Sequence, residues 1–513
     1  MTRRDYLLLF LLGLAVSVAV AAFQPAPGYM DADYYYAGGL QLAAGRGFTE
    51  PFLWNYLDDP AGLPHPSHTY WMPLASILAS IVPALFGPVS WFAARIPFYL
   101  AAACLPPLTA ALAFSLSSRR SLALVSGLLA VFSGFYVPFL VTTDTFALYM
   151  LFGGLFFLIV NRKSSIVYSF LLGLLAGLLH LSRTDGLLWL LMAFLAILYF
   201  RKPGQSLFSA LSSLLSVLAG YLVIMAPWFA RNEAAFGALL APGGSKMLWL
   251  TSYDQLYSYP AGQLTFQAWW DSGIGEILAA RAWSFGLNFA TLFSVQGGIF
   301  LLPLITLGVW PLRKDKRVQL AVTGWLLTFL AMTLAFPFAG ARGGFFHSGA
   351  ALQTVWWALA PIGLERVILW GRERRGWHEV HARSVFLGGM VGLAVLFSIL
   401  VLLLRIPAWG GESSAYSQID NFLVEQGMSG EDVVVVSNPP GFYLASGNQA
   451  IAVPDGTPVT VLELAQRYGA DYLVLEEGSI PAGLISVYEN PDAYSGLFYL
   501  GELEKARVFE IQP

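Results

Sequence analysis

Long apolar segments recur along most of the chain, and short polar stretches separate them. The first runs from Tyr6 to Phe23 and follows Arg3 and Arg4. About 20 apolar residues, each rising about 1.5 Å along a helix, cross the roughly 30 Å hydrocarbon core of a bilayer. Ten further segments of spanning length lie at residues 96–116, 122–140, 145–160, 166–181, 186–200, 207–228, 285–310, 318–336, 350–370 and 384–404. The pattern therefore predicts a polytopic bundle of about eleven transmembrane helices.

One shorter apolar stretch, Trp71 to Phe86, contains Pro73 and Pro83, so it could be a twelfth span or a helix lying in the membrane interface. Cytoplasmic loops carry an excess of Lys and Arg, and this rule favours eleven spans. With eleven spans, most of the 28 Lys and Arg fall in inside segments. These are Arg3, Arg4, Arg119, Arg120, Arg162, Lys163, Arg201, Lys202, Arg313, Lys314, Lys316, Arg317, Arg372, Arg374, Arg375 and Arg383. The N-terminus is then cytoplasmic, and three long segments, 24–91, 231–284 and 405–513, lie outside.

Composition supports a membrane protein and excludes several classes. Hydrophobic residues make up 57% of the 513 residues, charged residues only 12%, and the mean hydropathy is +0.63. Such values predict a multi-pass protein of the cell membrane. The net charge of -3 offers no basic surplus for a nucleic-acid partner. The single cysteine, Cys104, excludes an intramolecular disulfide framework and a cysteine-based metal cage.

The tail after residue 404 has a different pattern. Residues 419–426 and 461–468 have the pattern of helices, and residues 432–437 and 471–475 that of buried strands. This alternation predicts a small α/β domain with a parallel sheet. Pro439-Pro440-Gly441 indicates only a turn. The expected fold is thus mainly α, with a transmembrane domain at 1–404 and an extracytoplasmic α/β domain at 405–513.

Two carboxylates open the first outer segment. Asp31 and Asp33 stand at the start of a helix expected to reach Ala44. Such a pair could hold a divalent metal ion, or one member could take a proton from an acceptor hydroxyl. Alternatively, Asp31 caps the helix and stabilises its positive end.

Two histidines, His65 and His68, follow in a segment rich in proline and aromatic residues. They could ligate a metal or contact a phosphate, although Pro66 argues against a regular helix. The alternative is an interfacial loop in which Tyr70 and Trp71 face the lipid headgroups.

The remaining candidates occupy other outer turns. Asp144 precedes the fourth span and could be an active-site acid or a helix cap. Arg183 could contact a phosphate or simply pair with Asp185. Other outer cations that could neutralise a phosphate, or snorkel to lipid headgroups, are Arg231, Lys246, Arg342 and His347.

In its order of motifs the chain resembles the GT-C superfamily of membrane glycosyltransferases, in particular the protein O-mannosyltransferase and lipid A aminoarabinose transferase branch. The resemblance covers residues 1 to about 404. Its elements are the acidic motif in a long first outer loop, the closing Pro/aromatic segment, and the acid before the fourth span. Three sequence motifs also resemble those of this superfamily: GPVSWFAARIP (87–97), LSRTDGLL (181–188) and APWFARNEAAFG (226–237).

The resemblance implies sugar transfer, with inversion, from a polyprenyl-phosphate donor to a protein, lipid or glycan acceptor outside the cytoplasm. It implies catalytic roles for Asp31, its neighbour Asp33 and Asp144, and a phosphate contact for Arg231. The chain departs from many relatives in having Ala32 after Asp31 and His65-Pro66-Ser67 in place of Lys-Pro-Pro. The resemblance implies no specific cofactor. Asp31 and Asp33 could hold a divalent metal ion.

Two other function classes remain open. A transporter or flippase of lipid-linked saccharides would need ionisable residues within the spans and an inverted repeat. The predicted spans are almost free of charge, and no repeat is evident. A membrane scaffold whose tail binds a partner would leave the aromatic-rich segment 247–283 unexplained.

Overall fold

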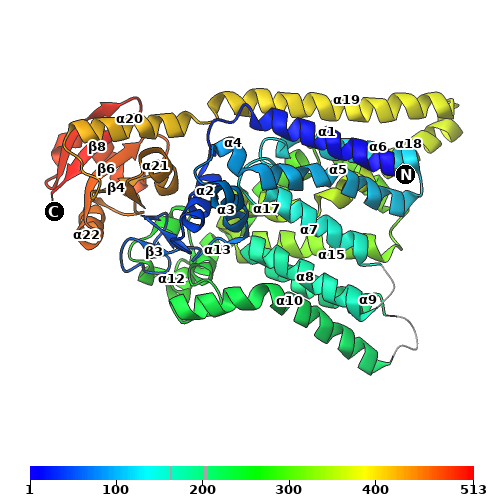
Figure 1. The fold of residues 1–513 in the computed structure, drawn as a ribbon, viewed down its shortest axis with the longest axis horizontal. Coiled ribbons are helices and arrows are strands. Elements are labelled where there is room, and N and C mark those ends of the chain that lie inside the picture. Colours follow the sequence, from blue (N-terminus) through cyan, green and yellow to red (C-terminus); the bar gives the residue numbers. More distant parts are fainter. Residues whose placement is uncertain (162–164, 202–205, 513) are drawn as a thin grey trace.

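The computed structural model describes residues 1–161, 165–201 and 206–512. The predicted inside residues Arg162, Lys163 and Lys202 lie outside this part. Most long helices run side by side in one bundle, with the N-terminus at one end and a β-sheet at the other (Figure 1). The architecture is mainly helical with a C-terminal region of helices and strands, as the sequence predicts, but its sheet is mixed and not purely parallel.

The long helices form an integral membrane bundle. By length and composition, five helical segments of the described residues can cross a membrane: Arg3–Ala21, Ile96–Ser117, Leu207–Phe236, Lys316–Ala335 and Glu379–Glu425. The bundle helices are α1 (Arg3–Ala21), α5 (Ile96–Ser117), α6 (Arg120–Val131), α7 (Phe146–Ile159), α8 (Ile166–Ser182), α9 (Leu187–Tyr199), α10 (Leu207–Phe236), α13 (Ile274–Thr291), α14 (Leu302–Val309), α15 (Lys316–Leu330), α18 (Gln353–Arg375) and α19 (Glu379–Arg405).

Two predicted spans are not continuous helices. The segment 285–310 breaks between α13 and α14, because Gly298 and Ile299 have positive φ angles and α14 begins with a proline in its first turn. The segment 122–140 ends as a helix at Val131, just before Gly134, which also has a positive φ. Turns therefore interrupt both apolar segments.

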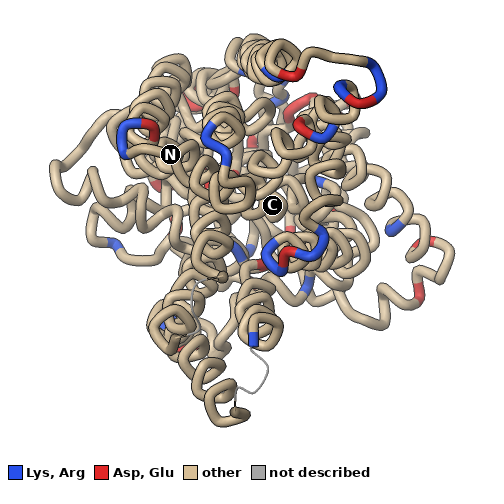
Figure 2. The backbone as a smooth tube through the Cα atoms, turned by 90° about the vertical axis from the view of Figure 1, so that its right-hand side faces the viewer, with Lys and Arg blue, Asp and Glu red and all other residues tan. Residues whose placement is uncertain are grey.

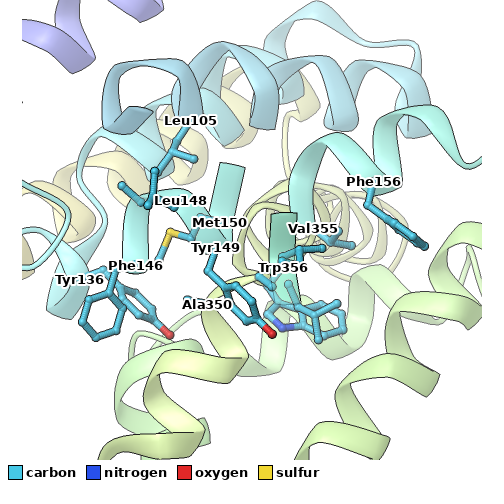
Figure 3. Close-up of a cluster of buried hydrophobic side chains, with 14 of the residues drawn as sticks. Leu105, Tyr136, Phe146, Leu148, Tyr149, Met150, Phe156, Ala350, Val355 and Trp356 are labelled. Atoms are coloured by element: carbon cyan, nitrogen blue, oxygen red, sulfur yellow. The ribbon is translucent and has the colours of Figure 1, made fainter. Parts of the chain in front are cut away.

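Close helix packing in the bundle depends on glycine. A Cβ on Gly173 of α8 would lie 2.0 Å from the carbonyl oxygen of Val217 on α10, and one on Gly220 of α10 would lie 2.1 Å from that of Phe170. Figure 3 shows part of the core, where buried side chains such as Leu105, Phe146 and Trp356 gather from α5, α7 and α18. Of the site residues described below, Asp144 directly precedes this core at the start of α7.

Ion pairs join the helix ends near the N-terminus. Arg119 and Arg383 both contact Glu365, each at 2.5 Å, and Arg120 contacts Asp5 at 2.6 Å. Figure 2 looks onto this end and shows basic residues at turns and helix ends. All three arginines belong to the set predicted to be cytoplasmic, so the packing is consistent with the predicted topology, which stays a prediction.

The segments at the other end lie between the bundle and the sheet. Helix α2 (Met30–Ala43) confirms the helix expected after Asp31, and it packs on α3 (Leu74–Phe86), the short apolar stretch. The shorter elements here are α4 (Trp91–Ala94), α11 (Gly243–Lys246), α12 (Phe266–Asp271), α16 (Pro337–Ala339) and α17 (Phe345–Ala350), with strands β1 (Thr49–Glu50) and β3 (His65–Pro66). Most of the candidate residues come from these segments.

The C-terminal sheet has six strands in the order β2-β5-β4-β6-β8-β7. Its strands are β2 (Phe52–Leu53), β4 (Val433–Val436), β5 (Gln449–Ala452), β6 (Ala470–Glu476), β7 (Leu497–Leu503) and β8 (Ala506–Ile511). The first four in this order are parallel, and β8 and β7 pair antiparallel. Its helices are α20 (Gly411–Glu425), α21 (Pro439–Ser446), α22 (Pro458–Tyr468) and α23 (Ile485–Glu489). Since β2 lies between α1 and α5, the segment predicted to be the first outer loop contributes a strand to the C-terminal sheet.

Candidate active site

Asp31 lies in the first turn of α2, at the end of the bundle that faces the sheet. Tyr29 is the N-cap residue and makes no side-chain cap, so Asp31 is not the capping residue. The Asp31 side chain keeps 29% of its surface exposed, and its Oδ2 lies 3.6 Å from Nε2 of His347. Burial and the nearby Asp144 carboxylate raise the pKa of Asp31 to about 6. Asp31 is therefore a mostly ionised and accessible carboxylate at pH 7.

His347, on α17, links the two acids. Its Nδ1 lies 2.9 Å from the carbonyl oxygen of Gly343, which can only accept, so this nitrogen donates. Its Nε2 lies 2.9 Å from Oδ2 of Asp144. Burial opposes the charged ring, but the Asp144 carboxylate outweighs it and raises the pKa of His347. With a proton on each nitrogen, His347 is an imidazolium between Asp31 and Asp144.

Asp144 is almost completely enclosed, with 1% of its side chain exposed. Burial opposes its ionisation, but the charge and hydrogen bond of His347 lower its pKa below the ordinary value. Tyr29 donates to its Oδ2 at 2.9 Å, and Thr145 donates to its Oδ1. Asp144 therefore has its acceptor positions filled, which fits an orienting acid better than a base.

Arg183 and Asp185 pair with each other at 2.8 Å, as the sequence allowed. Tyr149 donates to the second oxygen of Asp185 at 3.2 Å. Among the described residues, the two terminal nitrogens of Arg183 have no hydrogen-bond partner. The positive charge of Arg183 lowers the pKa of Asp31. Arg183 thus places donors near the cluster of Asp31, His347 and Asp144.

Arg342 is exposed and lies in the short helical turn Gly340–Gly344. Its guanidinium lies 4.9 Å from the ring centre of Tyr253. Burial raises the pKa of Tyr253, and the negative charge of Asp31 adds to the rise. Tyr70 shows the same two effects, burial first. Tyr70, Tyr253 and Arg183 therefore lie near enough to Asp31 for their charges to interact, and Arg342 packs on Tyr253.

Asp33 faces away from this cluster. Residues two apart on a helix point about 200° apart, so Asp31 and Asp33 cannot share one site. Asp33 accepts a hydrogen bond from Nδ2 of Asn438 in the C-terminal sheet region, at 2.9 Å. Burial and the charge of Glu412 raise the pKa of Asp33 well above its ordinary value.

Three further candidates support the first outer loop. The Arg231 guanidinium donates to the carbonyl oxygens of Phe48 and Ser67, at 3.1 and 2.7 Å. His68 is fully buried between Ser67 and a serine of α3, and burial lowers its pKa to about 3. His65 pairs with Asp58 at 2.7 Å. The structure does not bring these residues to Asp31.

Asp31, Asp144 and His347 could hold a divalent metal ion. One ligand atom from each lies within 4.8 Å of the others, and two carboxylates with an imidazole suit several divalent metals. Metal binding through Nε2 would require His347 to lose the proton that this nitrogen now donates to Asp144 in a hydrogen bond. Asp33, the other residue predicted to bind metal, is not in this group.

The sequence predicts His347 only as one of several outer cations that could neutralise a phosphate. Asp31, Asp144 and His347 are separated by 113 and 203 residues along the chain, and no local spacing links them. The Gly343-Gly344 pair before His347 was the available signal, because it allows the sharp turn that presents the ring.

No protein-family model matches this sequence, and no curated protein matches it either. Solved structures do match. The archaeal oligosaccharyltransferase AglB of Archaeoglobus fulgidus, in complex with an inhibitory peptide and a dolichol-phosphate, aligns over 99% of this chain and 74% of its own, with a TM-score of 0.57 and 13% identity.

ArnT of Cupriavidus metallidurans, bound to undecaprenyl phosphate, aligns over 99% of this chain and 98% of its own, with a TM-score of 0.57 and 12% identity. A mutant of the arabinofuranosyltransferase AftD from Mycobacteria aligns over 99% and 42%, with a TM-score of 0.53 and 13% identity. Across nearly its whole length, the chain thus has the fold of the GT-C membrane glycosyltransferases.

Proposed function

We propose that this protein transfers a sugar, with inversion, from a polyprenyl-phosphate donor to an acceptor hydroxyl on the non-cytoplasmic face of the membrane. The observation that carries the proposal is the accessible Asp31 carboxylate beside the His347 imidazolium. The shared fold supports it, since the matched AglB and ArnT structures hold dolichol-phosphate and undecaprenyl phosphate.

In the proposed reaction, the acceptor oxygen attacks the anomeric carbon from the side opposite the phosphate. Asp31 takes the hydroxyl proton as the new C–O bond forms, and the bond to the phosphate oxygen breaks. The polyprenyl phosphate leaves with the bonding electrons. Its growing negative charge is stabilised by His347 and Arg183, whose charges act on Asp31, and by Arg342, which packs on Tyr253.

The other residues receive supporting roles in this proposal. Asp144 holds His347 charged and oriented. The contacts of Arg231, His65 and His68 favour a structural role in the first outer loop over a phosphate contact. If a divalent cation binds, Asp31, Asp144 and His347 would hold it, and it would supply a positive charge to the leaving phosphate.

The test is transfer from polyprenyl-phosphate sugars by the purified full-length protein in lipid. Asp31→Asn keeps the shape of the side chain but removes the base, and we expect transfer to fall by about 10²- to 10⁴-fold. Asp59→Asn is the matched control, because Asp59 is an exposed acid of the same outer loop. Equal activity of wild type and Asp31→Asn would exclude Asp31 as the base.

A further inference from the structure

The C-terminal sheet region is joined to the helix that carries Asp31 through one buried side chain, Asn438. Asn438 lies at the carboxyl end of β4 and is 3% exposed. Its side-chain oxygen accepts the backbone N–H of Gly441 and so caps α21. The sequence predicts only a turn at the following Pro439-Pro440-Gly441, whereas these residues begin this helix.

The amide nitrogen of Asn438 bridges two carboxylates from distant parts of the chain. It donates to Oδ2 of Asp33 on α2 at 2.9 Å and to Oε1 of Glu412 on α20 at 3.0 Å. An amide nitrogen has two hydrogens, so these contacts use its full donor capacity. No Lys or Arg of the described residues pairs with Asp33 or Glu412. The neutral amide is therefore what keeps the two acids together.

Further contacts extend the bridge into the sheet. The hydroxyl of Tyr416 accepts the backbone N–H of Asn438 at 3.1 Å and donates to Oε1 of Glu476 at 2.9 Å. Glu476 ends strand β6, and its Oε1 also accepts the backbone N–H of Ser437 at 3.3 Å. The position of Asn438 is thus fixed by two neighbouring strands.

The turn before α7 also holds the start of helix α2. Thr143 donates to the carbonyl oxygen of Ala32 at 2.7 Å, and Tyr29 donates to Asp144. The backbone that carries Asp31 therefore has two supports, Thr143 and the Asp33–Asn438 pair. Only the first support comes from the transmembrane part.

We propose that Asn438 is a positioning residue for the active site: by binding Asp33 it fixes the first turn of α2, and with it the place of Asp31. This proposal rests on the role of Asp31 given above. It assigns the C-terminal region a part in catalysis without contact with either substrate. A displacement of about 1 Å at a reacting group can cost about 100-fold in rate, so a single hydrogen bond is enough.

Asn438→Leu is the first test, because leucine has a similar size and donates nothing. We expect kcat to fall about 10- to 100-fold while the KM for the donor stays within about twofold. Tyr443→Phe is the matched control. It removes the α21 hydroxyl that accepts a hydrogen bond from Nε2 of Gln41, at the far end of α2, and should leave kcat unchanged.

The exchange variant Asp33→Asn with Asn438→Asp provides a rescue. The new amide at position 33 can donate to the new carboxylate at position 438, and that carboxylate can still cap α21. In a Glu412→Gln background, which removes the carboxylate that would otherwise face the new one at position 438, we therefore expect the double variant to recover most of the kcat that Asn438→Asp loses. A double variant that is worse than either single variant would overturn the proposal, because independent structural damage adds.

Hydrogen exchange separates this proposal from the proposed reaction. Asn438→Leu should speed amide exchange in the first turns of α2 and leave strand β6 protected. Faster exchange in α2 without any activity in wild type would reject the reaction but keep the coupling. Unchanged exchange, or faster exchange with unchanged kcat, would overturn the positioning role.

Discussion

From the positive charge of His347 we predict how the rate of sugar transfer depends on pH. The base is active when ionised, so transfer should fall as the pH drops through the Asp31 pKa of about 6. His347→Gln removes the positive charge 3.6 Å from the Asp31 carboxylate. Because the imidazolium lowers the pKa of Asp31, its loss should move the acid limb of the profile upward.

The size of this shift follows from the separation of the two groups. Unit charges 3.6 Å apart interact by about 1 kcal/mol at a dielectric constant of 80 and by about 5 kcal/mol at 20. One pKa unit corresponds to about 1.4 kcal/mol. Solvent reaches the exposed face of Asp31, so we take the lower end, a rise of about one unit to about 7.

The assay is kcat/KM for transfer between pH 5.5 and 7.5, at constant ionic strength. For a rise of about one unit, the activity of His347→Gln relative to wild type should improve about sixfold across this range. His347→Arg, which keeps the charge, is the control and should keep the acid limb near pH 6. A ratio that stays flat with pH would refute the charge argument and favour a ligand role for His347.

Three further predictions follow from the contacts. Arg183→Gln should raise the donor KM by about tenfold, in line with the loss of one charge-assisted hydrogen bond, and initial rates at varied donor concentration measure this. Arg231→Ala should destabilise the protein by about 1–3 kcal/mol while the donor KM stays unchanged, because it leaves the carbonyl oxygen of Ser67 without a donor, whereas that of Phe48 keeps the N–H of Ser67; a higher donor KM at full stability would instead place Arg231 on the phosphate. Chelation with EDTA should leave transfer within about twofold of the untreated rate, since His347 and Asp144 already satisfy each other; a loss that added metal restores would assign Asp31, Asp144 and His347 as metal ligands.

Apolar periodicity made the bundle, the helix after Asp31 and the strands 432–437 and 471–475 predictable, because these signals are local. The breaks at Gly134 and Gly298 were not, since long apolar segments do not show where a turn interrupts them. The roles of His347 and Asn438 could not be predicted for another reason. Each acts on residues more than 200 positions away, and such contacts leave no local spacing in one sequence.

The two acids at the start of α2 show how helix geometry divides their roles. Asp31 and Asp33 look equivalent in sequence, but a separation of two residues turns them to opposite faces of α2. One face meets His347 and the accessible side of the cluster, and the other meets Asn438. The residue that reacts and the residue that holds the helix in place can therefore be adjacent in sequence without competing, and neither role could be moved to the other carboxylate without turning the helix.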